Sequence, residues 1–150
     1  MRLVLYEPEN PRNAGALIRL CACLGTPLDI IEPCGFVFSA RDIKKSALDY
    51  GALAAVETHS SWAAFAKSTL RKSGRLILLT TKADGPYYDF EFRSGDLLLL
   101  GQESAGVPDV VHNAADARVT IPMADGARSL NVAMAGGIVL SEALRQMRQT

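Results

Sequence analysis

Residues 97–106 have the sequence LLLLGQESAG, in which an apolar run leads directly into a loop bounded by glycines. Four consecutive leucines favour a strand buried on both faces, as in a parallel sheet. A glycine at each end of the loop permits tight backbone turns beside a ligand. The stretch therefore predicts a buried strand with a ligand-binding loop at its carboxyl end, although a plain turn between strand and helix would explain it about equally well.

Short apolar runs alternate with amphipathic stretches on both sides of this segment. The runs predict strands at 3–6, 28–31, 54–57, 76–79, 97–100 and 118–121. The amphipathic stretches predict helices over about 14–24, 40–50, 62–70, 108–111 and 129–147. This order indicates an α/β fold of three layers, α/β/α, with a mainly parallel sheet in a single domain spanning 1–150.

Composition limits the kind of protein. The chain has 150 residues, of which 49% are hydrophobic and 21% charged, as in ordinary globular proteins. We expect no secretory signal and no membrane span, and the cysteines at 21, 23 and 34 fit a reducing cytoplasm better than a disulfide framework or a metal site. The formal net charge is zero, so any contact with nucleic acid must depend on a local basic patch.

Two further segments have loop composition where a helix begins. Residues 10–15, NPRNAG, precede Arg19, and Asn10 or Asn13 can cap the helix that follows, so a well-capped helix with a surface arginine explains them too. In 121–133, Ser129 can cap the last helix, and Asn131 would then be unusual just inside it. That helix also holds Gly136 and Gly137, which favours close packing against another helix, such as one from a second subunit.

The three segments in register resemble the motifs of the SPOUT superfamily, methyltransferases whose α/β fold carries a deep trefoil knot in its C-terminal third. The resemblance is to the SpoU-type 2′-O-methyltransferase branch, extends over nearly the whole chain and includes no separate RNA-binding extension. Residues 4–9, 30–36, 48–50 and 79–82 are also similar to the members that methylate the wobble nucleotide of tRNA.

The resemblance implies S-adenosylmethionine as methyl donor, S-adenosylhomocysteine as product and no metal. The residues expected to contact the cofactor are Leu79, Thr80, Gly101, Glu103, Gly106, Ile121, Met123, Ser129 and Leu130. Arg19, supplied by the partner subunit of a homodimer, is the leading catalytic candidate. Because arginine stays protonated, we expect it to hold an RNA phosphate and stabilise the developing alkoxide rather than act as a base. Asn13, Ser129 and Asn131 would orient the ribose or support the loops.

The implied substrate is the first anticodon nucleotide, cytidine or uridine, in the anticodon stem-loop of leucine tRNAs. The candidate RNA-binding residues are Arg12, Arg41, Lys45, Lys82 and Arg128. For Arg41 and Lys45 a solvated helix face is the more ordinary explanation. The resemblance also implies a cytoplasmic protein.

Three alternatives stay open. The same chemistry could act on another tRNA position or on ribosomal RNA, and Ser141 stands where wobble-type relatives often have tyrosine. The chain could also be a knotted RNA-binding protein without catalysis. An ordinary nucleotide-binding module is disfavoured because the phosphate-binding fingerprints are missing.

Overall fold

Among the residues that the structure describes, six short strands form the centre of the molecule. They are β1 (Arg2–Tyr6), β2 (Leu28–Ile31), β3 (Val56–His59), β4 (Leu76–Leu79), β5 (Leu97–Leu100) and β6 (Ala117–Val119). The computed structural model describes residues 1–37, 55–83 and 85–148. The strands lie in the order β3-β2-β1-β5-β4-β6, and all five pairs of neighbours are parallel, which confirms the expected sheet.

Helices cover both faces of this sheet. They are α1 (Pro11–Leu24), α3 (Trp62–Lys67), α4 (Thr69–Ser73), α5 (Asp109–Ala114) and α6 (Val132–Arg148), with a 3-10 turn, η2, at Tyr87–Asp89. Leu98 and Leu100 pack with α1 and α6 on one face, while Leu97 and Leu99 pack with α3 and α5 on the other. The four leucines of β5 are at most 2% exposed, so the expectation of a strand buried on both faces is correct.

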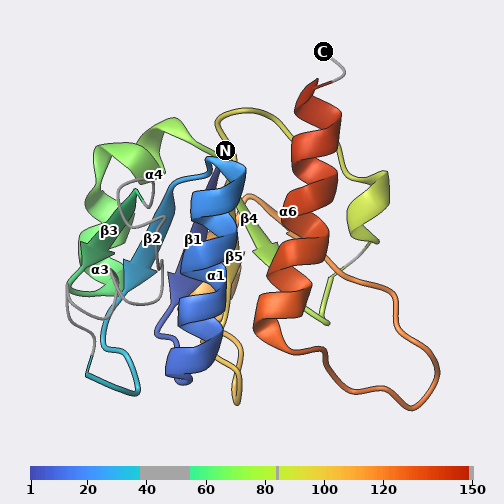
Figure 1. Cartoon of the computed structure of the whole chain (residues 1–150), viewed down its shortest axis with the longest axis horizontal. Helices are drawn as coiled ribbons and strands as arrows, with labels where there is room; N and C mark the ends of the chain where they lie inside the picture. Colours follow the sequence, from blue (N-terminus) through green and yellow to red (C-terminus); the bar gives the residue numbers. More distant parts are fainter. Residues whose placement is uncertain (38–54, 84, 149–150) are drawn as a thin grey trace.

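Helices α1 and α6 lie side by side on one face of the sheet (Figure 1). Gly136 makes this contact possible, because a Cβ atom there would lie 2.7 Å from Cδ1 of Leu100 and 3.0 Å from Cδ2 of Leu17. The close packing expected at the glycine pair is therefore found at Gly136, within the chain itself. Gly137 is less crowded, with Cδ2 of Leu20 at 3.6 Å from an added Cβ.

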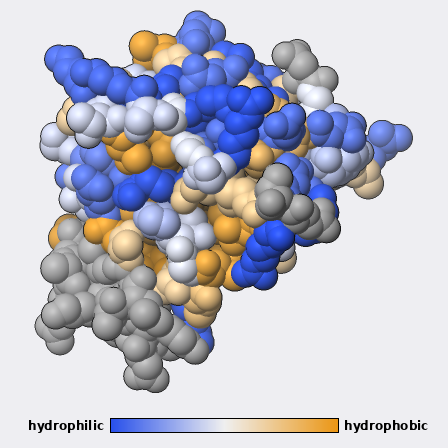
Figure 2. Space-filling view, turned by 90° about the horizontal axis from the view of Figure 1, so that it is seen from above, coloured by the Kyte–Doolittle hydropathy of each residue, from blue (hydrophilic) through white to orange (hydrophobic). Residues whose placement is uncertain are grey.

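The outer surface of α1 and α6 is partly apolar. Met134 is 63% exposed, Ile138 37% and Leu24 36%. Figure 2 shows hydrophobic residues gathered at the surface on this side of the molecule, in the lower part of the view. We call Leu24, Met134 and Ile138 the α1–α6 apolar face. No helix among the described residues has the length and hydropathy needed to cross a membrane.

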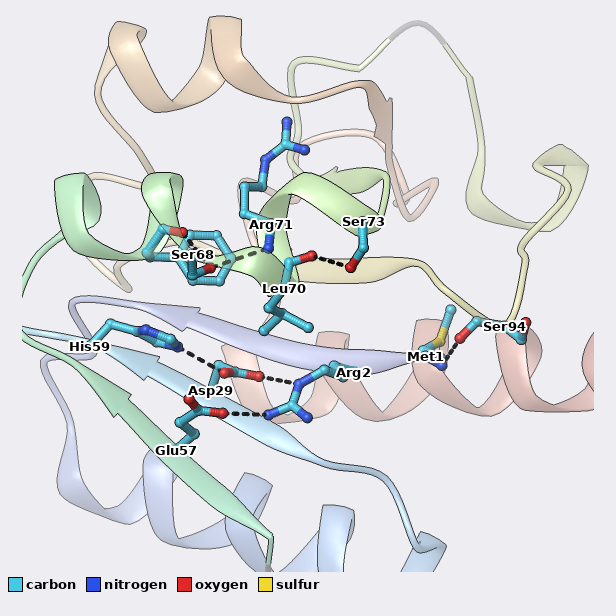
Figure 3. Close-up of polar contacts among 11 residues, drawn as sticks. Met1, Arg2, Asp29, Glu57, His59, Ser68, Leu70, Arg71, Ser73 and Ser94 are labelled. Atoms are coloured by element: carbon cyan, nitrogen blue, oxygen red, sulfur yellow. Dashed lines mark hydrogen bonds and ion pairs between the residues drawn. The ribbon is translucent and has the colours of Figure 1, made fainter.

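A buried charged cluster ties the first three strands together (Figure 3). The fully buried carboxylate of Asp29 accepts hydrogen bonds from Arg2 Nε at 2.6 Å and pairs with His59 Nε2 at 2.8 Å. Arg2 also reaches Glu57 at 3.3 Å. Asp29, Glu57 and His59 bring potential metal-ligand atoms within 4.8 Å of one another, but the guanidinium already supplies a positive charge against both carboxylates.

Some expected boundaries are wrong. The third strand lies two residues later than expected, and the last strand ends at Val119 rather than at residue 121. The single helix expected over 62–70 is two helices, because Ser68 ends α3 in an extended conformation and its side chain accepts from Arg71 N–H to cap α4. The helix expected over about 40–50 lies outside the described residues.

The start of the last helix is also corrected. α6 begins at Val132, and Asn131 rather than Ser129 caps it. The Asn131 side-chain oxygen accepts hydrogen bonds from Ala133 N–H at 2.9 Å and Met134 N–H at 3.2 Å. Asn131 therefore precedes the helix and satisfies two of its free backbone donors, which removes the apparent conflict of an asparagine inside the first turn.

Candidate functional site

A cavity of about 730 Å³ opens where the carboxyl ends of β4 and β5 and the segment after β6 meet the starts of α1 and α6. It lies near the point where the chain order reverses between β1 and β5, the usual ligand position in open α/β sheets. Its volume suits a drug-sized small molecule. The wall consists of residues 78–82, 100–107, 120–121 and 128–132, with Asn10, Asn13, Asp109, His112, Met123 and Ala135.

The loop at 101–106 is a tight turn closed on itself. Gln102 N–H donates to the Gly106 carbonyl at 2.8 Å, and Gly106 N–H donates back to the Gln102 carbonyl at 3.0 Å. Gly101 lies so close to Gly106 that an added Cβ would be 2.6 Å from the Gly106 carbonyl carbon. Gly106 has a φ of 70°, which other residues rarely adopt. Both glycines are therefore required by this turn.

The carboxylate of Glu103 joins this loop to the start of α1. One oxygen accepts from Glu9 N–H at 2.9 Å, and the other accepts from Asn10 N–H at 3.3 Å and from Asn13 Nδ2 at 3.1 Å. Glu103 thus neutralises free donors at a helix N-terminus, a favourable position for an anion. In this arrangement its carboxylate shapes the cavity wall.

Asn13 continues the connection to α6. Its side-chain oxygen accepts from Asn131 Nδ2 at 2.9 Å, while its own amide donates to Glu103. Asn131 donates through its amide NH₂, so its side-chain oxygen stays available to accept the hydrogen bonds that cap α6. The three side chains form a chain of hydrogen bonds, the Glu103–Asn13–Asn131 bridge, which joins the ends of three elements from distant parts of the sequence.

The loops after β4 and β6 are held beside each other by backbone bonds. Thr80 N–H donates to the Val119 carbonyl at 3.0 Å, and Thr120 N–H donates to the Gly85 carbonyl at 3.0 Å. Tyr87 N–H donates to the Thr120 carbonyl at 2.8 Å. These bonds bring 78–82 and 120–121 into one wall of the cavity.

His112 contributes an unusual group to the cavity wall. Arg118 Nε donates to its Nδ1 at 3.2 Å, so the neutral ring carries its proton on Nε2. That Nε2 atom is buried and has no hydrogen-bond partner among the described residues. A buried polar atom without a partner at a cavity wall is a feature that functional sites explain more readily than packing does.

The structure brings most of the sequence-predicted residues together. All nine residues proposed to contact a cofactor lie in the cavity wall, as do Asn13, Ser129 and Asn131. Among the proposed RNA-binding residues, Lys82 and Arg128 line the cavity and Arg12 is exposed outside it. Arg41 and Lys45 lie outside the described residues. Arg19 is exposed on α1 and does not line the cavity of its own chain.

Several wall residues had no signal in the sequence. Asp109 and His112 lie three residues apart on α5, so both reach the same side of that short helix. Ser104 belongs to the loop that the sequence singled out, and its position at the turn was the available clue.

Glu9 escaped notice because it acts from outside the cavity. Its carboxylate accepts from Ser104, and these bonds hold the pKa of Glu9 below its usual range.

Known proteins resemble the chain along almost its whole length. A tRNA (cytidine(34)-2′-O)-methyltransferase of Beijerinckia indica subsp. indica is 52% identical over 145 residues, which are 97% of this chain and 91% of that protein. A structure described as giving insights into the 2-OH methylation of C/U34 on tRNA is 40% identical, with a TM-score of 0.90, and the match covers 99% of this chain and 97% of that one.

A more distant structure is also informative. The SpoU methyltransferase AviRb from Streptomyces viridochromogenes, solved in complex with the cofactor AdoMet, is 29% identical with a TM-score of 0.84. The match covers 100% of this chain and 61% of that one. A model of the SpoU rRNA Methylase family matches residues 1–141. This chain therefore belongs to the SpoU rRNA Methylase family, and the cavity at the carboxyl ends of its strands is the candidate site of that family's chemistry.

Proposed function

We propose that this chain is an RNA 2′-O-methyltransferase that transfers a methyl group from S-adenosylmethionine to the ribose of nucleotide 34 of tRNA, with cytidine and uridine as acceptors. The observation that carries the proposal is the 52% identity, over 97% of the chain, to a tRNA (cytidine(34)-2′-O)-methyltransferase. The intact cavity in this chain supports the same activity. Leucine tRNAs, bound through the anticodon stem-loop, are the proposed substrates.

The cavity wall fits S-adenosylmethionine. Its apolar part, including Leu79, Ile121 and Leu130, suits an adenine ring, and the backbone of the neighbouring turns offers donors and acceptors to the ring edge. The unpartnered Nε2 of His112 gives a further donor. Gly101 allows the turn to close against Gly106, because an added Cβ would lie 2.6 Å from the Gly106 carbonyl carbon, and the closed turn forms part of the wall.

The bound cofactor would supply an electrophilic methyl group on a sulfonium, and its departing thioether is neutral. The protein therefore has to align the ribose oxygen and assist removal of the hydroxyl proton. Glu103 is a poor candidate for the base, because both of its oxygens already accept hydrogen bonds. We propose that Ser129, Lys82 and Arg128, which all lie in the wall, orient the ribose and its phosphates.

We propose a homodimer in which Arg19 acts in the partner's cavity. Three observations support this arrangement. Arg19 is exposed on α1 and is absent from its own cavity wall. The α1–α6 apolar face lies on the same pair of helices and lacks a partner within the described chain. A second copy seated there would bury this face and bring its Arg19 to a cavity that the chain's own Arg19 does not line.

We also propose that α6 passes through the loop between β4 and β5, which would make the trefoil knot. The chain leaves the edge strand β6 and returns as α6 beside α1, at the other side of β5. The same loop also contacts α6. Gln146 of α6 donates through Nε2 to the Phe90 carbonyl at 3.1 Å, and Gln146 Oε1 accepts from Phe92 N–H at 2.9 Å. We further propose that the chain works as one domain in the cytoplasm.

Methylation in vitro tests the substrate. The purified protein, labelled S-adenosylmethionine and leucine tRNA transcripts should yield one 2′-O-methylated nucleotide at the first anticodon position, located by mass spectrometry. A transcript with a 2′-deoxyribose at that position is the matched control and should accept no methyl group. Methylation at another tRNA position, or of ribosomal RNA only, would refute the proposed substrate while leaving the chemistry intact. Binding of RNA without any methyl transfer would refute the proposal that the chain is a methyltransferase.

A further inference from the structure

We infer that Glu9 is a positioning residue, which holds the 101–106 loop in the shape that receives the cofactor. The inference rests on the proposed function and concerns a residue outside the cavity wall. Its side chain lies behind the loop and reaches Ser104, which is part of the wall. Glu9 therefore acts on the ligand only through the loop.

Both oxygens of the Glu9 carboxylate are used. Oε2 accepts from Ser104 N–H at 2.8 Å, and Oε1 accepts from Ser104 Oγ–H at 2.7 Å. A carboxylate is the side chain that matches this pair of donors, because it accepts through two oxygens and donates nothing. Hydrogen bonds to an ionised acceptor are also about twice as strong as neutral ones.

The connection is reciprocal. Ser104 donates to Glu9, and the preceding residue, Glu103, accepts from the backbone N–H of Glu9 at 2.9 Å. The two segments are 95 residues apart in sequence, yet each supplies a carboxylate to the other. We call this pair of contacts the Glu9–Glu103 clasp.

Glu9 can hold the loop because its own backbone is fixed. Gly35 packs against it so closely that an added Cβ would lie 3.0 Å from the Cα of Glu9. Gly35 N–H also donates to the Pro8 carbonyl at 2.9 Å. The segment that carries Glu9 is thus braced against the chain that follows β2, and the side chain extends from a rigid base.

The loop needs such support. The two hydrogen bonds between Gln102 and Gly106 close the base of the turn, whereas Ser104 and Ala105 at its tip are exposed. Without the clasp the tip would have to be ordered when the cofactor binds, at a cost in affinity. Glu9 therefore orders the loop before the cofactor binds, and the tip of that loop lines the ligand cavity.

Glu9→Gln tests the inference, with Glu91→Gln as the matched control. Glu91 is exposed, and its carboxylate contacts only Arg93 among the described residues, at 3.6 Å. The glutamine in place of Glu9 offers one oxygen and one NH₂ instead of two carboxylate oxygens, and the charge that strengthens both hydrogen bonds is lost. We expect calorimetry to show S-adenosylmethionine binding weakened about tenfold in the Glu9 variant and unchanged in the control. The KM for S-adenosylmethionine should rise by the same factor, with kcat at saturation retained.

Amide hydrogen exchange of the ligand-free protein supplies a second measurement. Exchange of Ser104 N–H should accelerate in Glu9→Gln, whereas the amides of β5 keep their protection. Ser104→Ala should weaken binding similarly, and the double variant should be no worse than the worse single one. Unchanged affinity, or a fall in kcat with KM constant, would overturn the inference. Absence of binding by the unaltered protein would instead refute the proposed function, and exchange at Ser104 would still test the clasp.

Discussion

The side-chain amide of Asn131 donates a hydrogen bond to the side-chain oxygen of Asn13 at 2.9 Å, which ties the start of α6 to the start of α1. The two residues are 118 positions apart in the sequence. Asn13 passes the connection on to Glu103 in the loop after β5. The energetic effects of substitutions at these three residues should therefore depend on one another rather than add.

Asn131→Asp separates the two tasks of this residue. Aspartate keeps an oxygen that caps α6, but it cannot donate to Asn13, so we expect stability within about 0.5 kcal/mol of the unaltered protein. Methyl transfer should nevertheless fall, because the α1 and α6 ends lose their link. Urea unfolding and steady-state kinetics measure the two effects. Asn131→Ala is the control that loses both, and it should destabilise by about 1 kcal/mol. Full activity in Asn131→Asp would show that the link has no role in catalysis.

Arg19→Ala should abolish methyl transfer while leaving the affinity for S-adenosylmethionine nearly intact. The reason is that Arg19 is exposed on α1 and lies outside the cavity of its own chain. If the chain forms the proposed dimer, mixing this variant with one defective in the cavity, such as Gly101→Val, should restore part of the activity, since a mixed dimer would have one intact site. Equal loss of transfer and cofactor binding would contradict the role given to Arg19, and so would a lack of recovery from well-folded mixed dimers.

Asp29→Ala should be among the most destabilising single changes in the described chain. The carboxylate is fully buried between Arg2 and His59, so its removal leaves buried polar groups without their partner, at a cost of about 3–5 kcal/mol. Glu57→Ala is the matched control, because the Glu57 side chain is 62% exposed and its ion pair is worth less than about 1 kcal/mol. Urea titration of both variants gives the comparison. Similar losses in the two would mean that burial does not govern this cluster.

The two neighbouring glycines of α6 should respond differently to alanine. Gly137→Ala meets only an ordinary contact at 3.6 Å, so the better helix propensity of alanine should stabilise the protein by up to about 1 kcal/mol. Gly136→Ala places a methyl group 2.7 Å from Leu100, a side chain within the core, and should cost about 1–3 kcal/mol through overpacking. Thermal unfolding of the pair is the measurement, and a stabilised Gly136 variant would mean that Leu100 repacks freely.

Acid should weaken α6 through Glu142. Hydrogen bonds from Arg145 and, to a smaller extent, Gln146 lower the pKa of Glu142 from 4.5 to about 2. A carboxyl whose pKa is lower in the folded state adds stability above its unfolded pKa and loses it as the pH falls. The contribution should be complete above pH 4.5 and disappear as the pH approaches 2. Because Arg145 is exposed, we expect less than about 1 kcal/mol. Glu142→Gln should remove this part of the pH dependence, measured by urea unfolding between these pH values.

The sheet could be predicted from the sequence largely because two of its inner strands, β4 and β5, are uninterrupted apolar runs. Leu76–Leu79 and Leu97–Leu100 have the predicted bounds, and all of their residues except Leu79 are buried. β3 was misplaced because its Glu57 is exposed at the edge of the sheet, where the apolar signal is weak. The order of the strands had no local signal, since it depends on pairing between distant segments.

The candidate site was predictable where a loop follows a strand and only there. The residues at 101, 121 and 129 lie in one cavity wall, as expected from their motifs. His112 and Asp109 were missed because a short helix carries them, and Glu9 was missed because its role appears only when Ser104 is seen beside it. The capping role of Asn131 was assigned to Ser129, since both residues are good caps and only the observed start of α6 distinguishes them.

The cavity draws its walls from segments as late as residues 128–135. Proteins are synthesised from the N-terminus, so a nascent chain still attached to the ribosome holds β1 to β5 before the last wall has emerged. The methyl donor can therefore meet a complete cavity only after residues 128–135 have emerged from the ribosome and folded. A copy truncated before residue 128 would hold most of the lining residues and yet present a cavity that is open on one side.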